Sequence, residues 1–374
     1  MGDERRAAFV GMSAGETSGM RDHAALLAQA LAPEGVSCSM HWLAREHESL
    51  GAARAETGAW ARRLREELLR ERPDVVLLHY SPFAYSYRGV PLLLRSTLAA
   101  LREARAPVVT FMHECAYPWR AGDWRGNLWA ATQRAALIEV MRASRAAVVT
   151  TDFRAEWLGS RRWLPRMPLA LAPVFSTLPP PGSGQHPERR NLVGLFGYAF
   201  QGAAVALVLD ALGLLERRGI EVRLLLLGAP GPASAAGETW LAGARERGID
   251  SLLSFTGRLP AQELSDALAR CDVLLFSAAA GPTSRKTTLA ASLASGRPVL
   301  ATDGPRRWSE LIERDAAALA APTASALADA LAAMLADEAA GDALGRRGRA
   351  FAGERMSLAR SAAVVAGLFE EVLS

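Results

Sequence analysis

The stretch FTGRLPAQELSDALARCDVLLF, residues 255–276, followed by GPTSRKTTLAASLASGRPVLATDG, residues 281–304, decides the fold. Short continuous apolar runs alternate there with segments of helical periodicity. The predicted order is strand 253–255, helix 261–269, strand 273–276, helix 287–294 and strand 298–301. Strands of continuous Val, Leu and Ala separated by helices are typical of a parallel sheet covered on both faces. The stretch therefore predicts an α/β domain.

The same alternation extends toward the N-terminus and predicts a second domain of the same kind. Upstream of the deciding stretch we expect strand 192–196, helix 203–217 and strand 222–227. In the first half we expect strands at 7–12, 75–79, 108–112 and 147–150, and helices at 20–31, 58–70, 91–103 and 127–143. Two doubly wound Rossmann-like domains in tandem are expected to face each other across a ligand cleft at the carboxyl ends of their strands.

A segment rich in proline, glycine and polar residues separates the two series. It reads LPPPGSGQHPERR, residues 178–190, and disfavours both helix and strand. We therefore predict an N-terminal domain over 1–177, a linker over 178–190 and a C-terminal domain over 191–356. A final helix over 357–374 is expected to pack back toward the N-terminal domain.

Composition narrows the class of protein. The chain has 374 residues, 50% of them hydrophobic, and a net charge of +4. This length suits two domains, and the dispersed charge does not predict a nucleic-acid partner. No apolar run approaches the roughly 18 residues of a membrane helix, so we expect a cytoplasmic protein; its basic character also suits the inner face of a membrane. Three separated cysteines suggest neither a disulfide framework nor a zinc site.

The deciding stretch resembles the donor-domain signature of GT-B fold glycosyltransferases, specifically the family 4-like group. The features that carry the resemblance are a G-x-L turn, a helix rich in Glu, Leu and Ala, an Asp-led strand and an A-x-G-x-P-V turn. The resemblance implies a hexosyltransferase (EC 2.4) that moves a sugar from a nucleotide-diphosphate sugar to an acceptor, with retention of configuration. The acceptor would be a glycan, a lipid-linked glycan or a small molecule. No metal or other cofactor is expected, since no acidic metal-binding cluster such as DxD is visible.

The predicted donor site centres on the start of the 287–294 helix. A helix N-terminus favours anions, and arginine and lysine can neutralise a leaving diphosphate. Lys286 is the single lysine among 43 basic residues. The predicted phosphate-binding residues are Ser284, Arg285, Lys286, Thr287 and Thr288. An ordinary capped helix with two solvated cations is the structural alternative.

Two departures from the resembling family sharpen this prediction. The two places of its Glu-x7-Glu pattern are filled here by Thr283 and Ala291. The loop after the 192–196 strand lacks the usual Arg and Lys and contains Gly197 and Tyr198 instead. We infer that Arg285 and Lys286 take over the phosphate role, as in divergent members with an S-R-[RK]-x-[ST] loop. Gly257 and Arg258 are expected to approach the nucleotide.

The N-terminal domain contributes the other predicted site residues. His113 and Glu114 follow the 108–112 strand, where a histidine at a strand's carboxyl end can orient a sugar or assist proton transfer. The resemblance places a His-Glu pair at this position. The predicted acceptor or cleft residues are Gly15, Ser18 and Gly19 in the first loop, and His79, Tyr80 and Tyr85. The loop SAGETSGM lacks GxGxxG spacing, which disfavours a Rossmann oxidoreductase.

Other interpretations are open at this point. A sugar-nucleotide epimerase on the same fold is one alternative, and a nucleotide-sugar binding protein without turnover is another. For the aromatic loop around Tyr80 and Tyr85, simple packing is as good an interpretation as stacking on an acceptor. Trp119, Trp124 and Trp129 lie among arginines and fit an acceptor lip, a membrane-surface patch or ordinary packing.

Overall fold

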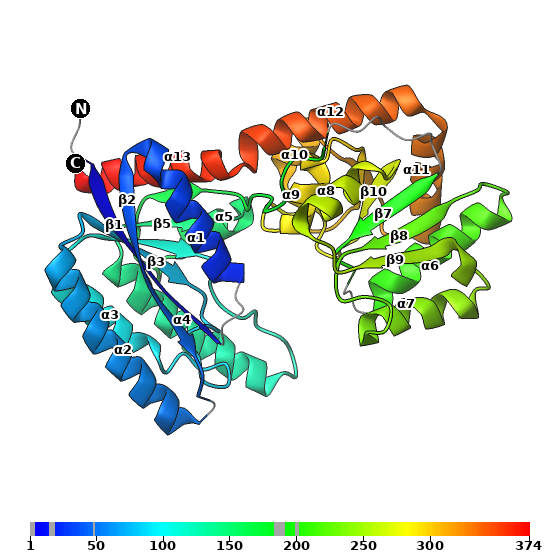
Figure 1. Ribbon diagram of the computed structural model, residues 1–374. Coiled ribbons are helices and arrows are strands. Elements are labelled where there is room, and N and C mark those ends of the chain that lie inside the picture. The colour runs from blue at the N-terminus through cyan, green and yellow to red at the C-terminus, as the bar shows by residue number, and fades with distance from the viewer. Residues whose placement is uncertain (1–3, 15–18, 48, 183–190, 199–201) are drawn as a thin grey trace. The chain divides into compact units, whose positions relative to one another are not determined.

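The chain folds into two compact units in a computed structural model that describes residues 4–14, 19–47, 49–182, 191–198 and 202–374. The first unit contains residues 1–173 and 358–374, and the second contains residues 174–357 (Figure 1). Each unit is built around a six-stranded parallel sheet. The sequence prediction of an α/β fold with two doubly wound sheets is confirmed.

The sheet of the first unit has the order β2-β1-β3-β4-β5-β6, and every pair in it is parallel. Its strands are β1 (Arg5–Ala14), β2 (Val36–Arg45), β3 (Val75–Tyr80), β4 (Val108–Met112), β5 (Ala146–Val149) and β6 (Leu169–Leu171). The first strand pairs with β2 on one side and with β3 on the other. The direction of winding therefore reverses between β1 and β3.

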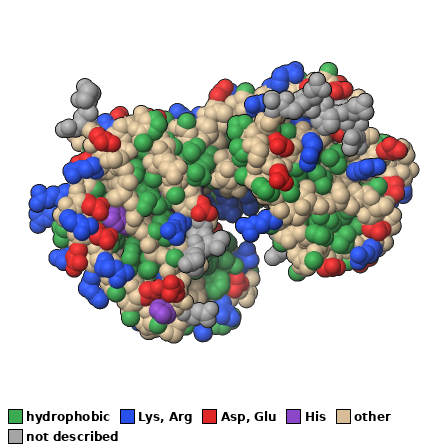
Figure 2. All heavy atoms as spheres, viewed as in Figure 1, with side chains coloured by type: hydrophobic (Ala, Val, Ile, Leu, Met, Phe, Trp, Pro, Cys, Tyr) green, Lys and Arg blue, Asp and Glu red, His purple; other side chains and the backbone are tan. Residues whose placement is uncertain are grey.

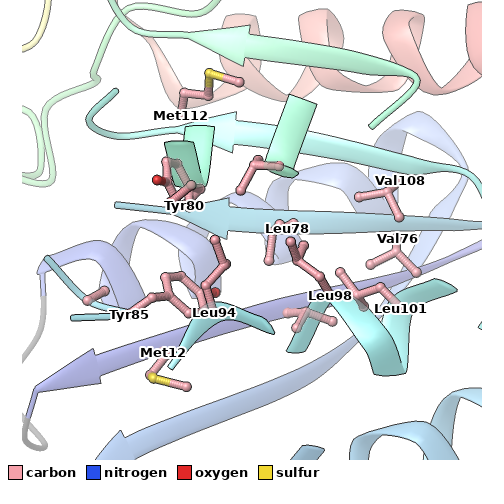
Figure 3. Packing of buried hydrophobic residues seen from close by; sticks show 14 of the residues in the cluster. Met12, Val76, Leu78, Tyr80, Tyr85, Leu94, Leu98, Leu101, Val108 and Met112 are labelled. Carbon is pink, nitrogen blue, oxygen red and sulfur yellow. The ribbon is translucent and has the colours of Figure 1, made fainter. Parts of the chain in front are cut away.

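Helices cover both faces of this sheet, because successive strand residues point to opposite sides and both sides are apolar. Val76, Leu78 and Tyr80 of β3 lie in one core cluster, shown in Figure 3, while Val75 and Leu77 lie in the other. The first cluster packs against α2 (Leu50–Glu71), α3 (Leu94–Ala104), α4 (Trp124–Ala143) and α5 (Asp152–Gly159). The second packs against α1 (Gly19–Leu31) and the C-terminal α13 (Leu358–Leu373).

The sheet of the second unit has the order β12-β11-β10-β7-β8-β9 and is also parallel. Its strands are β7 (Leu192–Phe196), β8 (Arg223–Leu227), β9 (Leu253–Gly257), β10 (Val273–Phe276), β11 (Val299–Thr302) and β12 (Ala318–Ala320). One face packs against α6 (Gly202–Arg217), α7 (Ala235–Glu246) and α11 (Ala324–Ala336), and the other against α8 (Ala261–Ala269), α9 (Thr287–Ala294), α10 (Ser309–Glu313) and α12 (Glu338–Arg355). Two short 3-10 helices, Ala32–Glu34 and Asp250–Leu252, complete the described elements.

Several elements were not predicted from the sequence. The additional elements are β2, β6, β12, α5, α7, α10, α11 and α12, and α2 begins eight residues before the predicted start at residue 58. Of the predicted linker, Leu178 to Gly182 pack on α8 through hydrogen bonds such as Ser265 Oγ to the Pro179 oxygen, 2.6 Å. Among the described residues, no helix is long and apolar enough to cross a membrane. Basic and acidic side chains are interspersed over the face of each unit that Figure 2 shows.

Candidate functional site

The second unit has its topological switch point between β7 and β10. The chain winds from β7 to β8 on one side, and β10 continues to β11 on the other. In open α/β sheets, ligands bind where the loops leaving the carboxyl ends of two such strands diverge. The two loops here are the one that begins at Gly197 and the one over residues 277–286, which leads into α9. Sequence reasoning placed the donor site in these same loops.

Gly197 and Thr288 are brought together at this switch point. Gly197 has a φ of 77°, and a Cβ built on it would lie 2.7 Å from Thr288 Cγ2. Glycine is therefore needed both for the left-handed backbone and for the close approach of the helix. Tyr198 follows it with a fully buried ring, whose hydroxyl accepts a hydrogen bond from Gly231 N at 2.5 Å. The side chain of Tyr198 thus anchors the loop and presents no surface to a ligand.

The loop over residues 277–286 is fixed by the loop that follows β11. Thr302 Oγ1 accepts a hydrogen bond from Ala278 N at 3.0 Å, and Trp308 N donates to the Pro282 oxygen at 2.8 Å. A Cβ on Gly304 would lie 2.2 Å from Gly281 N, so the two backbones approach too closely for any larger residue. This packing holds the start of α9 rigidly at the carboxyl edge of the sheet.

The start of α9 presents two cations. Arg285, Lys286 and Thr287 are exposed, Thr288 is half-buried and Ser284 is buried. Neither Arg285 nor Lys286 forms an ion pair with any residue that the structure describes. Lys286 is the N-cap residue and makes no side-chain capping bond, so the first amides of the helix are available. Although the residue is exposed, the surrounding protein removes part of the water around its ammonium group; this desolvation, and then the neighbouring charge of Arg285, lower the pKa of Lys286.

A buried hydroxyl lies next to this cluster. Thr283 is 5% exposed, and its Oγ1 is buried with no hydrogen-bond partner in the described part of the chain. An unsatisfied buried hydroxyl costs about 1–3 kcal/mol, so it is more readily understood beside a ligand than in a sealed core. Sequence reasoning noted Thr283 as a replacement for a family glutamate but did not include it among the site residues.

Gly257 and Arg258 lie at the carboxyl end of β9, which is separated from β10 by β7 and β8. Gly257 has a φ of 63° and pairs with Gly228 in an isolated bridge, while Arg258 is exposed. Both residues lie on the same edge of the sheet as Gly197, since all strands of the sheet are parallel. The structure does not bring them into contact with the α9 cluster.

The first unit brings His79 and His113 together at the carboxyl edge of its sheet. His79 lies on β3 opposite Phe111 of β4, and His113 follows directly after β4. The nitrogens His79 Nδ1 and His113 Nε2 are 3.0 Å apart. His79 is fully buried, whereas His113 is half-buried. Glu114 is half-buried and accepts a hydrogen bond from Ser81 Oγ at 3.1 Å.

His23 of α1 is a third ring in this group, and sequence reasoning missed it. It lies on the buried face of α1, 7% exposed, with its ring centroid 5.3 Å from that of His113. Burial lowers the pKa of His23 to about 4. Burial also lowers the pKa of His79 and of His113 well below the usual value, and the neighbouring rings add to this. The only signal in the sequence was a histidine in the second turn of a helix that follows the first loop.

One ring nitrogen from each histidine lies within 4.8 Å of the others, so the group has the donor types of a transition-metal site. A ligating histidine usually donates its second ring N–H to a carboxylate or carbonyl. If His79 ligated through Nδ1, its second nitrogen, Nε2, would be left buried without such a partner among the described residues. The ring of His79 is surrounded instead by Phe9, Trp42 and Phe111, which makes the fit to a metal poor.

The remaining predicted residues of the first unit divide into two groups. Tyr80 and Tyr85 are fully buried, and their rings stack at 6.0 Å between centroids (Figure 3). Burial leaves no ring surface for an acceptor, so in the structure their role is packing. Gly15 and Ser18 lie outside the described residues, and Gly19 is the exposed first residue of α1.

In the first unit, aromatic and arginine side chains of segments that follow β3, β4 and β5 contact one another. Phe83, Tyr117 and Trp129 contact one another edge to face, with centroids 5.4–6.3 Å apart. Arg134 lies over the rings of both Trp119 and Trp157, and Trp157 contacts Trp163. Trp119 is 57% exposed and Trp163 44%. We call these residues, together with Arg161, the aromatic–arginine surface. It includes two of the three tryptophans noted in the sequence, Trp119 and Trp129; the third, Trp124, is 74% exposed at the start of α4.

Comparisons with known proteins agree with this architecture. Residues 190–337 match the family model described as glycosyl transferases group 1. No curated protein matches the chain by sequence. The solved structures that are similar to it include a sucrose-phosphate synthase from Thermosynechococcus elongatus, with a TM-score of 0.71 and 15% identity over 98% of this chain and 99% of that chain.

Two further structures show the same likeness over the full length. HepE from Anabaena, solved in complex with UDP and glucose, has a TM-score of 0.67 and 14% identity, covering 98% of this chain and 100% of that one. WaaG, a glycosyltransferase involved in lipopolysaccharide biosynthesis, has a TM-score of 0.64 and 16% identity, covering 97% and 99%. Residues 190–337 thus match the glycosyl transferases group 1 family model, and the chain as a whole has the GT-B fold of the glycosyltransferase structures to which it is similar.

Proposed function

We propose that the chain is a glycosyltransferase whose donor is a nucleotide-diphosphate sugar bound at the start of α9. The observation that carries the proposal is the pair of exposed cations, Arg285 and Lys286, which have no acidic partner among the described residues. They lie at a helix N-terminus beside the β7–β10 switch point, within the segment that matches the glycosyltransferase family. A similar structure, HepE, was solved with UDP and glucose, which supports this class of donor.

The reaction needs cations where charge develops. In the transfer, the acceptor oxygen forms a bond to the anomeric carbon, the bond from that carbon to the phosphate oxygen breaks, and the acceptor loses its proton. The departing nucleoside diphosphate gains negative charge. Arg285 can hold two phosphate oxygens through its planar fork, and Lys286 supplies a point charge. The free amides at the start of α9 add to this stabilisation, which is worth most when it is preorganised. Retention of configuration is proposed on the resemblance to the family.

His113 is proposed to orient a sugar hydroxyl through a hydrogen bond. The pKa of His113 is well below its usual value because the ring is buried near two other histidines and Arg154. The ring is therefore neutral near pH 7 and is poorly suited to act as a proton donor in an acid–base cycle. A neutral imidazole still donates through one nitrogen and accepts through the other. This favours positioning over proton transfer, and no cofactor or metal is required for it.

The first unit is proposed to bind the acceptor and to associate with the surface of a membrane. The aromatic–arginine surface supports this part of the proposal. Exposed tryptophans are amphipathic and favour the boundary between lipid and water, and arginines are attracted to anionic headgroups. An acceptor linked to lipid would then be presented at the carboxyl edge of the first sheet, close to His113.

A panel of ligands tests the donor assignment. UDP-, GDP- and dTDP-sugars and the free nucleotides are compared by thermal shift on the full chain. A ligand at 100 times its dissociation constant stabilises the folded protein by about 2.7 kcal/mol, so binding is readily detected. Binding together with slow release of free sugar in the absence of acceptor supports the transferase. Interconversion of the bound sugar would instead indicate an epimerase, binding without turnover would indicate a binding protein, and the absence of any shift would contradict the proposal.

A further inference from the structure

The contact between His79 and His113 joins the edges of the two rings. The rings are within 26° of parallel with centroids 5.3 Å apart, yet His79 Nδ1 and His113 Nε2 are separated by only 3.0 Å. Two rings stacked face to face at that centroid distance would not bring ring nitrogens so close. The nitrogens therefore share one proton in a hydrogen bond, with one as donor and the other as acceptor.

Burial decides which nitrogen is the donor. Both rings are neutral because burial lowers the pKa of each, so each ring carries one proton. If His113 Nε2 were the donor, the proton of His79 would lie on Nε2, which is buried and has no partner among the described residues. If His79 Nδ1 is the donor, the proton of His79 lies on Nδ1, and the buried Nε2 carries only a lone pair. Buried N–H groups without partners are rarer than buried acceptors without partners, which favours the second arrangement.

The surroundings hold both rings in this arrangement. His79 lies on β3 among Phe9, Trp42 and Phe111, so its ring has little freedom to turn. The backbone at His113 is fixed on both sides, since its N donates to the Tyr80 oxygen at 2.9 Å and its oxygen accepts from Arg154 Nη1 at 2.5 Å. His113 Nδ1 makes no hydrogen bond with any described residue, and His113 is half-buried where His79 is fully buried.

We propose that His79 is a positioning residue, which donates its Nδ1–H to His113 Nε2 and thereby fixes His113 as the neutral tautomer with its proton on Nδ1. The inference rests on the proposed function, because it gives His113 the N–H that donates to a sugar hydroxyl. The arrangement uses one histidine to set the tautomer of another, which is the task that a buried carboxylate performs in hydrolase triads. A neutral partner leaves His113 uncharged, which suits hydrogen bonding to a substrate rather than proton uptake.

The test measures the tautomers directly on the full chain labelled with ¹⁵N-histidine. The protein contains six histidines, so long-range ¹H–¹⁵N spectra at pH 7 are assigned by single replacements. The expected result is a protonated Nδ1 and a bare Nε2 on both His79 and His113. A protonated Nε2 on either ring would overturn the proposal. So would one tightly bound zinc per chain whose removal by a chelator changes these signals. The spectrum needs no donor or turnover, so its outcome is independent of whether the proposed function holds.

Two variants at one position connect the tautomer to turnover. His79→Asn places an amide N–H close to the former Nδ1, whereas His79→Phe fills the space with a ring that cannot donate. We expect His79→Asn to keep the Nδ1–H tautomer of His113 and most of the activity. His79→Phe should give mixed tautomers of His113 and a fall in kcat of at least about tenfold, with little change in donor affinity. If the folded His79→Phe and His79→Asn variants had equal kcat values and equal His113 spectra, the proposal would be contradicted. The spectrum of the unmodified chain tests the proposal even if the His79→Phe variant does not fold.

Discussion

Lys286 is the residue at which the local electrostatics of the donor site are easiest to measure. Desolvation by the surrounding protein and the adjacent Arg285 both disfavour its charged form, so its pKa is lowered in the free protein. A bound diphosphate would reverse this balance, because an anion within a few ångströms favours the ammonium ion. Donor binding should therefore be coupled to uptake of a proton wherever Lys286 is partly neutral.

The coupling has a defined sign. Because the pKa of Lys286 is lowered in the free protein and raised by a phosphate, donor affinity is highest below the free pKa and falls as the pH rises through it. A charge-assisted hydrogen bond is worth about 1.5–3 kcal/mol, so the dissociation constant of the donor should rise by roughly tenfold to a hundredfold as Lys286 loses its charge. Calorimetry of donor binding from pH 7 to 10 measures it. Lys286→Arg keeps its charge throughout and should flatten the profile; identical profiles for the two proteins would contradict this role of Lys286.

The three clustered histidines of the first unit, His23, His79 and His113, should make its folding sensitive to acid. Burial holds their pKa values below that of an unfolded histidine, about 6.5, and brings His23 to about 4. Below pH 6.5 the unfolded chain binds protons that the folded chain cannot, so the stability contributed by the neutral rings is present above pH 6.5 and is lost as the pH falls. Each ring contributes a slope that approaches about 1.4 kcal/mol per pH unit.

Urea denaturation between pH 7 and 4 measures this slope. His23→Gln should reduce it by about 1.4 kcal/mol per pH unit below pH 6.5. His47→Gln is a matched control, since it removes an exposed ring that lies outside the cluster of three histidines. A His23→Gln profile that coincides with that of the unchanged protein would show that His23 is not held neutral by the fold.

At the scale of elements, buried strands were predicted well and the half-exposed elements were not. The central strands β3, β4, β7 and β10 are continuous apolar runs because helices cover both of their faces. The strand β2 is VSCSMHWLAR, which is partly exposed and mixes polar with apolar residues, and it was missed. The helix α12 was missed because its mixture of Ala, Gly and Arg gives little apolar periodicity. The helix α11 was also missed, although its buried residues Leu327, Leu331 and Leu335 recur at helical spacing.

A buried ion pair ties three elements of the second unit together. Arg297, just before β11, lies 3.5 Å from Asp272, which precedes β10, and both side chains are at most 9% exposed. Asp272 also accepts a hydrogen bond from Leu192 N at the start of β7, 2.8 Å. Arg297 in addition donates to the Cys271 oxygen. The pair thus fixes the amino ends of the strands whose carboxyl ends form the switch point.

Removing one partner of this pair should destabilise the second unit. Asp272→Ala leaves a buried guanidinium without its carboxylate, so we expect the free energy of unfolding to fall by about 3–5 kcal/mol. Asp329→Ala breaks the surface pair with Arg218, in which the two side chains are 61% and 39% exposed, and should cost no more than about 1 kcal/mol. Urea denaturation compares the two. Similar losses would mean that the Asp272 pair does not hold these strands.

At the scale of the whole molecule, the sequence predicted where in the fold the candidate site residues lie, but only part of how they contact one another. The sequence indicated the loops at the carboxyl ends of strands, so Gly197, Thr288 and His113 fall where the topology needs them. It could not reveal that His23 lies against His113, or that His79 bonds to it, because these contacts join residues far apart in the chain. Nor could it distinguish the buried rings of Tyr80 and Tyr85 from exposed ones.

The aromatic–arginine surface leads to a prediction about the intact protein. If it lies on a membrane, the full chain should sediment with vesicles that contain phosphatidylglycerol and much less with vesicles of phosphatidylcholine alone. Trp119→Ala together with Trp163→Ala should reduce the bound fraction several-fold. Leu373→Ala, which removes another exposed apolar side chain of the same unit, is the control and should bind like the unchanged protein. Equal sedimentation with both kinds of vesicle would contradict membrane association.

The central claim is that Arg285 and Lys286 hold the diphosphate of the donor, and calorimetry tests it most directly. The measurement titrates the best nucleotide sugar of the panel into the unchanged chain and into the Arg285→Ala, Lys286→Ala double variant. A second double variant, Arg245→Ala with Arg346→Ala, removes the same charge from exposed positions elsewhere in the unit. We predict that the first variant binds at least about a hundredfold more weakly and that the second binds normally. Unchanged affinity in the first variant, with its fold intact, would contradict the account.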